Sequence, residues 1–154
     1  MKRLKISKVF PKGHPREGEV TGFKDAILCG KKIHTFRKNK SKKYKDGMLV
    51  SLCELSEASR KSKSAVILRD VKIRVEPATI QVRDFRLASI VIGQENIKYN
   101  IQTVLANDGL DGRNNEFDFI CWFFPRKPKD AEWKGSCIYF DYTHIPQFPK
   151  ENQK

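Results

Sequence analysis

The sequence predicts a single α+β domain in which short strands form a small curved sheet that closes as a barrel beside two or three short helices. The chain has 154 residues, a length that favours one domain, and no repeat or Gly/Ser-rich linker divides it. Short β-branched and aromatic runs recur along it, while only a few segments have apolar residues at helical spacing. We therefore predict one domain over residues 1–154, with a short polar tail from about residue 146.

The first third of the chain predicts one short helix and one strand. Residues 22–29 have an apolar face at helical spacing, with Thr21 as the N-cap and Gly30 in the left-handed position that ends many helices. The β-branched and aromatic run 32–37 then predicts a strand. The polar, lysine-rich segment 38–46 is expected to form an exposed loop.

Most of the remaining segments predict strands, because their apolar residues are continuous or alternate along the chain. The predicted strands cover residues 48–55, 64–75, 80–82, 87–92, 97–99 and 136–142. The strand over 64–75 is expected to bend near Asp70. Pro77 is expected to interrupt it, since proline lacks the N–H that a sheet requires.

Two more helices are expected in the last third of the chain. Residues 101–106 can form a short helix, followed by an Asn- and Gly-rich turn over 107–112. Residues 116–124 carry apolar side chains at helical spacing, and either Asn114 or Asn115 is expected as the N-cap.

Composition disfavours membrane and metalloprotein classes. No run approaches the ~18 consecutive apolar residues of a spanning helix, and the basic N-terminus lacks the apolar segment of a signal peptide. We therefore expect a cytoplasmic protein without a membrane partner. The four cysteines form no Cys-x-x-Cys pair and the three histidines show no metal-ligand spacing, so we expect reduced thiols and neither a metal nor another cofactor.

The charge favours a polyanionic partner. The net charge is +13 and the pI about 9.7, a field that attracts nucleic acids and, second, acidic membrane surfaces. Residues 31–45 contain eight Lys or Arg and no acidic residue. This segment is either a solvated loop or a phosphate-binding one, and we favour nucleic-acid contacts from Lys38, Lys40, Lys42, Lys43, Tyr44 and Lys45. Tyr44 and Trp133 are expected to be exposed and to stack on bases, and Tyr142 and His144 to flank a groove.

The segment after the first helix carries a family resemblance. Residues 30–37 contain the pattern Gly-x-Lys-x-x-Thr-x-Arg, which resembles the signature of ASCH domains, a family of the PUA-like superfamily. Residues 10–16, 21–24 and 105–110 are similar to a subgroup of that family common in phages and bacterial mobile regions. The resemblance implies a PUA-like barrel of five or six mixed strands with flanking helices, and RNA or a nucleoside or nucleotide as the ligand.

The same resemblance implies a candidate reaction. Some small bacterial members of the family remove the acetyl group from N4-acetylcytidine and related N4-acylated cytosines. In those members the lysine and threonine of the signature and a downstream acidic residue are implicated in catalysis. They match Lys32, Thr35 and, with Asp in place of the usual Glu, Asp108, while the signature arginine matches Arg37.

These residue types suit hydrolysis of an amide on an exocyclic base nitrogen. A threonine becomes a nucleophile when a base takes its proton, and a lysine can be that base if burial or a nearby cation such as Lys31 lowers its pKa. Asp108 would orient a substrate amine or a water, and Arg37 would bind a carbonyl or phosphate oxygen. His34 would act as a general base or stack on a nucleobase.

Strand geometry limits this site. On a regular strand Lys32 and Thr35 would lie on opposite faces, so they can meet only if Lys32 lies at the helix–strand junction, before the alternation begins. The predicted ligand pocket consists of Lys31, Lys32, His34, Thr35, Arg37 and Asp108.

Three functions fit these observations. The first is a module that binds RNA or a modified nucleotide in a basic cleft, because a shared fold does not transfer an activity. The second is an amidohydrolase of N4-acylcytidine-type nucleosides, and a weaker third is a phage or mobile-element accessory protein that binds DNA or another protein. The sequence makes no prediction of the oligomeric state.

Overall fold

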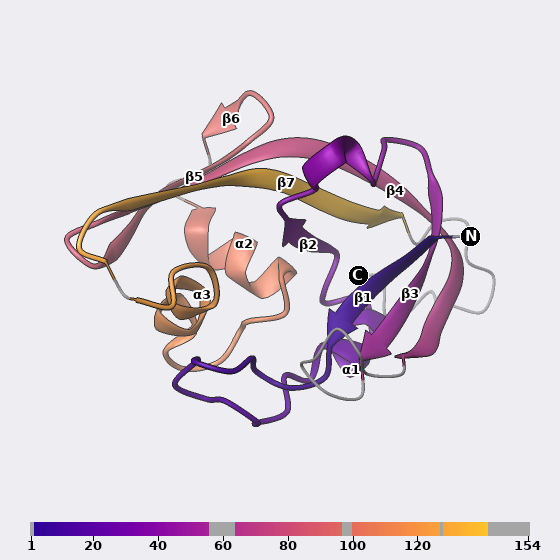
Figure 1. Ribbon diagram of the computed structural model, residues 1–154, viewed down its shortest axis with the longest axis horizontal. Helices are drawn as coiled ribbons and strands as arrows, with labels where there is room; N and C mark the ends of the chain where they lie inside the picture. The colour runs from indigo at the N-terminus through magenta and orange to yellow at the C-terminus, as the bar shows by residue number, and fades with distance from the viewer. Residues whose placement is uncertain (1, 56–63, 97–99, 127, 142–154) are drawn as a thin grey trace.

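The structure, a computed structural model, describes residues 2–55, 64–96, 100–126 and 128–141 (Figure 1). Its strands are β1 (Lys2–Ser7), β2 (His34–Arg37), β3 (Leu49–Leu55), β4 (Ser64–Arg83), β5 (Arg86–Ile92), β6 (Glu95–Asn96) and β7 (Ala131–Asp141). Its helices are α1 (Phe23–Leu28), α2 (Ile101–Asn107) and α3 (Asn115–Phe123), with a short 3-10 turn η1 (Lys40–Lys42). The predicted strand over 97–99, the tail from 146, and Tyr142 and His144 lie outside the described residues.

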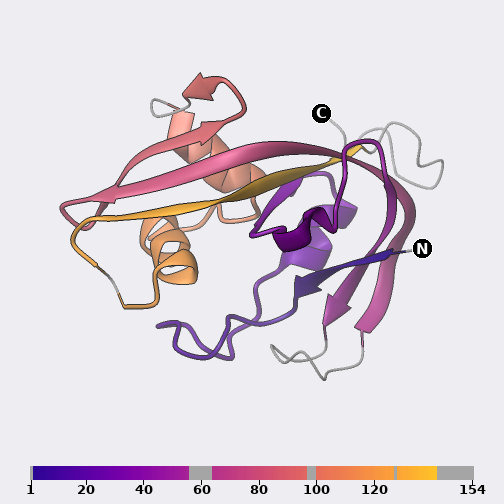
Figure 2. The same cartoon turned by 45° about the horizontal axis from the view of Figure 1, so that its top comes forward.

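The long strand β4 organises one mixed sheet. Its first half pairs with β3 and its second half lies between β5 and β7, all antiparallel, while β1 adds to β3 in parallel and β2 pairs with β7. Figures 1 and 2 show β4 curving across the width of the molecule with β7 beside it. Asp70 has a φ of 55°, which places the irregularity of β4 where a bend was predicted.

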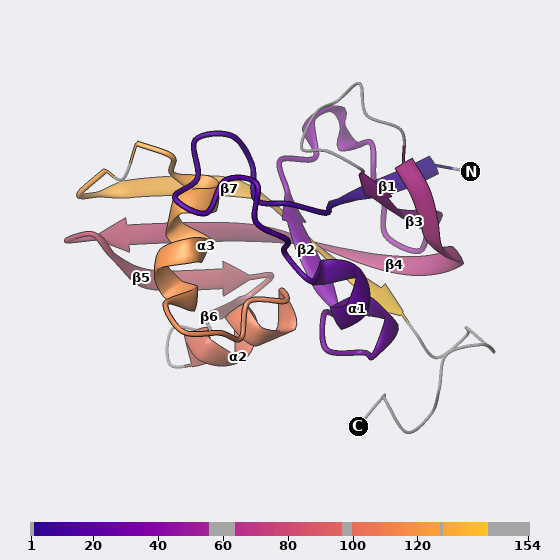
Figure 3. The ribbon, with the colours of Figure 1, turned by 90° about the horizontal axis from the view of Figure 1, so that it is seen from below.

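The helices cover one face of this sheet. Seen from below, α3 lies across β7, β4 and β5, α2 lies next to it near β6, and α1 lies beside β2 near the β1 side of the molecule (Figure 3). A single apolar core fills the space between the sheet and the helices, with Leu4, Ile80, Leu105, Phe119 and Ile138 among its most deeply buried members. The α+β class and the three flanking helices agree with the sequence prediction. No helix in the described ranges has the length and apolar character needed to cross a bilayer.

The described strands do not close into a barrel, because β1 forms no ladder with β2. Three side chains, of which Arg37 belongs to β2, instead donate hydrogen bonds to alternate carbonyl oxygens of β1. They are Tyr44 Oη to Arg3 O (2.9 Å), Arg37 Nη2 to Lys5 O (2.6 Å) and Thr21 Oγ1 to Ser7 O (2.8 Å). These bonds satisfy carbonyl groups that a sheet edge would otherwise leave open to another chain.

The prediction that Pro77 interrupts the sheet is wrong, since β4 continues through it and takes in the separately predicted strand 80–82. In an antiparallel strand the N–H and C=O of one residue point to the same side. Pro77 O accepts a hydrogen bond from Gly93 N (2.9 Å), just beyond the end of β5 at Ile92. The missing N–H therefore faces a place where the partner strand has already ended, and the ladder with β7 loses nothing.

Both ends of α1 are set by glycine. Gly30 has a φ of 80°, and the bonds from Gly30 N to Ile27 O (3.1 Å) and from Lys31 N to Ala26 O (2.8 Å) form the predicted left-handed helix end. The predicted N-cap is wrong by one residue: Gly22 occupies it, while Thr21 Oγ1 accepts a weaker bond from Phe23 N (3.3 Å). For α3, Asn114 is the N-cap, one of the two predicted residues.

Candidate functional site

The candidate site begins at the junction between α1 and β2. Lys32 N donates to Ala26 O (3.0 Å), and Ile33 N donates to Asn107 O (2.8 Å) at the end of α2. These bonds hold the chain out of the strand until His34, where β2 begins, rather than at the predicted residue 32. Lys32 therefore precedes the strand, and its side chain need not point to the face opposite Thr35. This is the condition under which the two side chains can line the same site.

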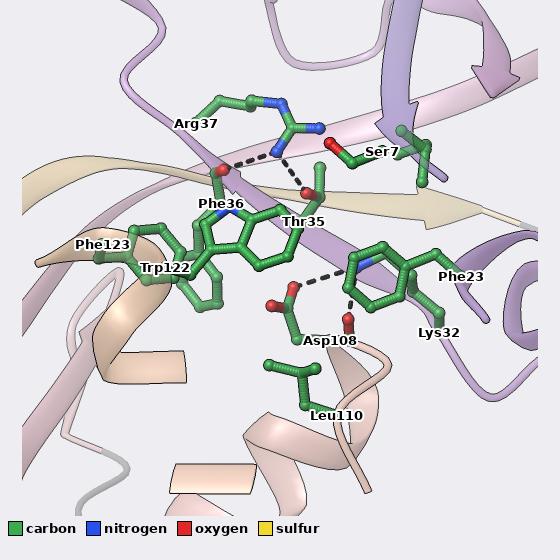
Figure 4. Close-up of a pocket in the computed structure, with 11 residues that line it drawn as sticks. Ser7, Phe23, Lys32, Thr35, Phe36, Arg37, Asp108, Leu110, Trp122 and Phe123 are labelled. Atoms are coloured by element: carbon green, nitrogen blue, oxygen red, sulfur yellow. Dashed lines mark hydrogen bonds and ion pairs between the residues drawn. The ribbon is translucent and has the colours of Figure 1, made fainter. Parts of the chain in front are cut away.

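Lys32 is almost completely buried, with 1% of its surface exposed. Its Nζ donates to Asp108 O (2.5 Å), to His34 O (3.0 Å) and to Asp108 Oδ1 (3.3 Å). The same atom lies 4.4 Å from the centroid of the Phe23 ring, within the range of a cation–π contact (Figure 4). An ammonium group at this position is well coordinated but has little contact with solvent.

The pKa values of Lys32 and Asp108 are both lowered from their ordinary values. Burial lowers the pKa of Lys32 below its ordinary value; the carboxylate of Asp108 partly offsets this, and the charge of Arg37 adds to it. Burial alone would raise the pKa of Asp108, but Lys32 and His34 together lower it below its usual range. Titratable groups perturbed in this way inside one cavity are typical of functional sites.

Asp108 is placed by the end of α2, where it is the C-cap residue. Its Oδ1 accepts from Lys32 and lies 3.3 Å from His34 Nδ1, whereas its Oδ2 has no partner among the described residues. The side chain is only 9% exposed, so this oxygen is a buried acceptor that a ligand N–H or a water would satisfy. Gly109 follows with a φ of 92°, and a Cβ there would lie 2.8 Å from Phe23 Cδ1.

Thr35 and Arg37 form the second part of the site. Arg37 Nη1 donates to Thr35 Oγ1 (2.7 Å) and to Phe36 O (2.9 Å), while Nη2 bridges the seam to Lys5 O. Burial lowers the pKa of Arg37, with Asp108 opposing the shift, yet a guanidinium stays protonated. Because a cation donates to its oxygen, the Thr35 hydroxyl must direct its own proton elsewhere, and its alkoxide would be stabilised.

These residues surround one cavity at the seam between β1 and β2 (Figure 4). Its walls come from β1, α1, the α1–β2 junction, β2, the end of α2 and α3: Ile6, Ser7, Phe23, Lys32, Thr35, Phe36, Arg37, Asp108, Leu110, Trp122 and Phe123. The space between them is about 380 Å³, counting the part that opens to solvent, but the centre of a water-sized sphere can reach only about 20 Å³ of it. The seam between β1 and β2 thus contains a narrow pocket that has both polar groups and apolar side chains in its walls.

Four of the six predicted pocket residues line this cavity: Lys32, Thr35, Arg37 and Asp108. Lys31 is exposed and does not. His34 is buried behind Asp108 and packs edge-on against Phe36 and Tyr139, so it is placed to orient the carboxylate, and the prediction that it stacks on a base is wrong.

The basic loop, residues 38–45, is only partly as predicted. Its lysines are exposed, and the side chains of Lys40, Lys42 and Lys45 make no hydrogen bond or ion pair within the described part of the chain. The predicted exposure of Tyr44 is wrong: the residue is 9% exposed, and its hydroxyl donates to Arg3 O at the edge of β1. Trp133 is likewise buried, at 8%, with Lys38 Nζ 5.1 Å from its ring centroid.

Sequence reasoning missed the aromatic side of the cavity. Phe23 and Trp122 lie in the two segments, 22–29 and 116–124, for which the sequence predicts an apolar helix face, and no local pattern separates a core aromatic from a pocket wall. Trp122 is held from behind by Phe10, whose ring centroid lies 5.5 Å away, and by His14, whose Nε2 bonds Asp118 O (2.9 Å). Arg16 adds an ion pair to Asp118 (2.8 Å), so the loop before α1 supports this wall.

Within the described residues no group of three or more His, Cys, Asp or Glu side chains is arranged to hold a metal ion. The chain was compared with protein-family models, curated proteins and solved structures. No family model matches the chain, no curated protein matches it, and no solved structure matches it.

Proposed function

We propose that this chain is an amidohydrolase of N4-acylated cytosine nucleosides, built on a PUA-like ASCH domain whose barrel is left open at the β1–β2 seam. One observation carries the proposal: a buried lysine amine with a lowered pKa, a hydroxyl held by an arginine and a buried carboxylate line one cavity. These are the three groups that the signature resemblance implies for the reaction. The curved mixed sheet with three helices supports the fold part of the proposal.

The proposed reaction proceeds in two balanced steps. Lys32, as the neutral amine, takes the proton of Thr35, and the alkoxide attacks the acyl carbon to form a tetrahedral intermediate. The C–N bond breaks, Lys32 returns the proton to the departing N4 amine, and an acyl-threonine ester remains. Water then hydrolyses this ester to release the carboxylic acid and restore the hydroxyl.

The remaining groups support these steps. Arg37 stabilises the developing alkoxide through its bond to Thr35 Oγ1. The Oδ2 of Asp108, which has no partner among the described residues, accepts the amide N–H or orients the attacking water. His34 holds Asp108 in place.

The burial and the hydrogen bonds of Lys32 and Arg37 support a catalytic role in the cavity over simple binding of a phosphate. A phosphate-binding lysine needs access to solvent, yet Lys32 has 1% of its surface exposed. Arg37 already uses three of its N–H donors on protein oxygens, where a guanidinium has five in all. Neither residue is well placed for a phosphate contact, and this supports catalysis over phosphate binding in the cavity.

RNA binding remains a second candidate, at the basic loop. Its five lysines are exposed and no acidic residue interrupts residues 38–45. Asn39 holds the loop in shape through paired bonds with the backbone of Tyr44 (both 2.9 Å), so the lysines project from a fixed backbone. This loop would bind a polynucleotide whether or not the cavity is catalytic.

A direct assay tests the hydrolase. Purified protein is incubated with N4-acetylcytidine, and cytidine release is followed by absorbance and chromatography. We expect turnover by the wild type and a loss of at least about 100-fold in Thr35→Ala, the scale of a removed acid–base or nucleophilic group. Thr103→Ala, on the exposed face of α2, is the matched control and should retain full activity. No turnover by the wild type, or equal rates in wild type and Thr35→Ala, refutes the proposal.

A further inference from the structure

We infer that Ser7 is a further catalytic residue of this site, whose hydroxyl donates a hydrogen bond to the oxygen that becomes negatively charged when Thr35 attacks the acyl carbon of the substrate. This inference rests on the proposed function and adds to it a group that lies outside the signature of residues 30–37. It is carried by the place of Ser7 in the cavity wall and by the hydrogen bonds that already occupy the neighbouring donors.

The proposed reaction moves negative charge from one oxygen to another. While Thr35 is an alkoxide, its Oγ1 is stabilised by the hydrogen bond from Arg37 Nη1 (2.7 Å). Once Oγ1 is bonded to the acyl carbon, the charge lies on the former carbonyl oxygen of the substrate. Stabilisation of that oxygen is usually the largest electrostatic contribution to acyl transfer, so the site requires a donor directed at it.

The cationic donors of the cavity are largely occupied by protein oxygens. Lys32 Nζ has three N–H groups as an ammonium, and it lies 2.5, 3.0 and 3.3 Å from Asp108 O, His34 O and Asp108 Oδ1. Both N–H groups of Arg37 Nη1 are used as well, on the Thr35 hydroxyl and on a backbone carbonyl, while Nη2 donates to a carbonyl of β1. A new oxyanion therefore needs a donor that the protein does not already use.

Ser7 supplies such a donor. It lines the cavity from the end of β1, and Figure 4 shows its hydroxyl directed toward Thr35 and Arg37. Its Oγ makes no hydrogen bond to any residue that the structure describes, so the O–H group can rotate toward a substrate oxygen without breaking a bond to these residues.

The backbone on both sides of Ser7 is held in place. Thr21 Oγ1 donates to Ser7 O (2.8 Å), and Arg37 Nη2 donates to Lys5 O (2.6 Å), two residues earlier on the same strand. Ile6, between them, is buried with 1% of its surface exposed. A donor on a fixed backbone requires little reorganisation when charge develops on the substrate, which is the property of an oxyanion hole. The guanidinium that holds the nucleophilic hydroxyl thus also holds the strand that carries the second hydroxyl.

Three variants test the inference, with N4-acetylcytidine as the substrate. Ser7→Ala should lower kcat by about 100- to 1,000-fold, the cost of one oxyanion-hole donor, and leave KM unchanged because the bond forms only in the transition state. Ser7→Thr, which keeps a hydroxyl, should recover most of that loss. Lys8→Ala, at the exposed next residue, is the matched control and should have the kcat of the wild type.

The outcomes separate this inference from the proposed function. Equal kcat in Ser7→Ala and the wild type, a loss that falls on KM alone, or a Ser7→Thr variant as slow as Ser7→Ala overturns the inference and leaves the proposed hydrolase standing. An acetyl group trapped on Ser7 also overturns the inference, because Ser7 would then be the nucleophile. No turnover by the wild type overturns both. Thermal unfolding of Ser7→Ala should match the wild type, because its Oγ bonds none of the described residues.

Discussion

Replacing Lys32 by methionine would remove the amine from the buried pair and leave Asp108 charged in an apolar surrounding. Methionine preserves most of the volume, so the change isolates the charge. Removing one partner of a buried ion pair costs about 3–5 kcal/mol, because the other charge is left without compensation. Unfolding free energies of single domains are typically about 5–15 kcal/mol, so this loss is a large fraction of the total.

The magnitude should depend on pH in a defined direction. In the wild type the folded pKa of Asp108 is lowered, so its contribution to stability is present above the ordinary pKa of 3.8 and is lost as pH falls through the folded value. Without Lys32, the largest of the interactions that lower the pKa of Asp108 is lost, so this pKa should be higher in the variant than in the wild type. The cost of Lys32→Met should therefore be largest near neutral pH and shrink as the pH falls and Asp108 takes up a proton.

Urea unfolding followed by circular dichroism measures this cost. The double variant Lys32→Met/Asp108→Asn, in which neither charge remains, is compared with the single variant. We expect the single variant to lose about 3–5 kcal/mol at neutral pH, which corresponds to about 6–20 °C in Tm for a domain of this size. The double variant should recover a large part of that loss because no charge remains unpaired. A cost below about 1 kcal/mol, or one that does not change with pH, would refute the buried pair.

Three further predictions follow from the same contacts. The kcat/KM of the wild type should rise with pH, with a midpoint below 10.5, the ordinary lysine value, because burial lowers the pKa of Lys32. The charge of Arg37 also lowers this pKa, so Arg37→Gln should move the midpoint to higher pH. An unchanged midpoint in Arg37→Gln would contradict this assignment. Gly109→Ala should lose at least about 1 kcal/mol in thermal unfolding, since its φ is 92° and a Cβ would press on Phe23, whereas Gly112→Ala, with open space around its Cβ, should be close to neutral. If the basic loop binds single-stranded RNA, replacing three of its lysines by glutamine should reduce the slope of log K against log salt by about 2, while the same change at three exposed lysines of the N-terminal part should not. The two variants carry Lys40, Lys42 and Lys45, or Lys8, Lys12 and Lys24, changed to glutamine.

Local patterns predicted the elements that depend on nearby residues. Gly30 ends α1 as expected because a left-handed residue followed by two backbone bonds is a local requirement. Lys32, Thr35, Arg37 and Asp108 line one cavity, a grouping that the resemblance to the ASCH signature implied and that the spacing of the residues alone does not predict.

Features that depend on distant partners could not be predicted in this way. Pro77 is tolerated inside β4 only because β5 ends beside it, and strand ends are set by pairing rather than by composition. Tyr44 is buried despite its lysine-rich neighbours because the open edge of β1 needs its hydroxyl. The left-open seam, and hence the shape of the cavity, depends on tertiary geometry that no residue pattern contains.

The most direct test of the shared cavity is to trap the acyl group on the protein. Wild-type protein is mixed with excess N4-acetylcytidine, quenched in acid within the first turnovers and analysed by intact mass and peptide mapping. The account predicts an added mass of one acetyl group located on Thr35, absent from Lys32→Met and from Thr35→Ala. Cytidine release with the acetyl group found on another residue, or unaffected by loss of Lys32, would contradict the claim that amine, hydroxyl and carboxylate act as one site.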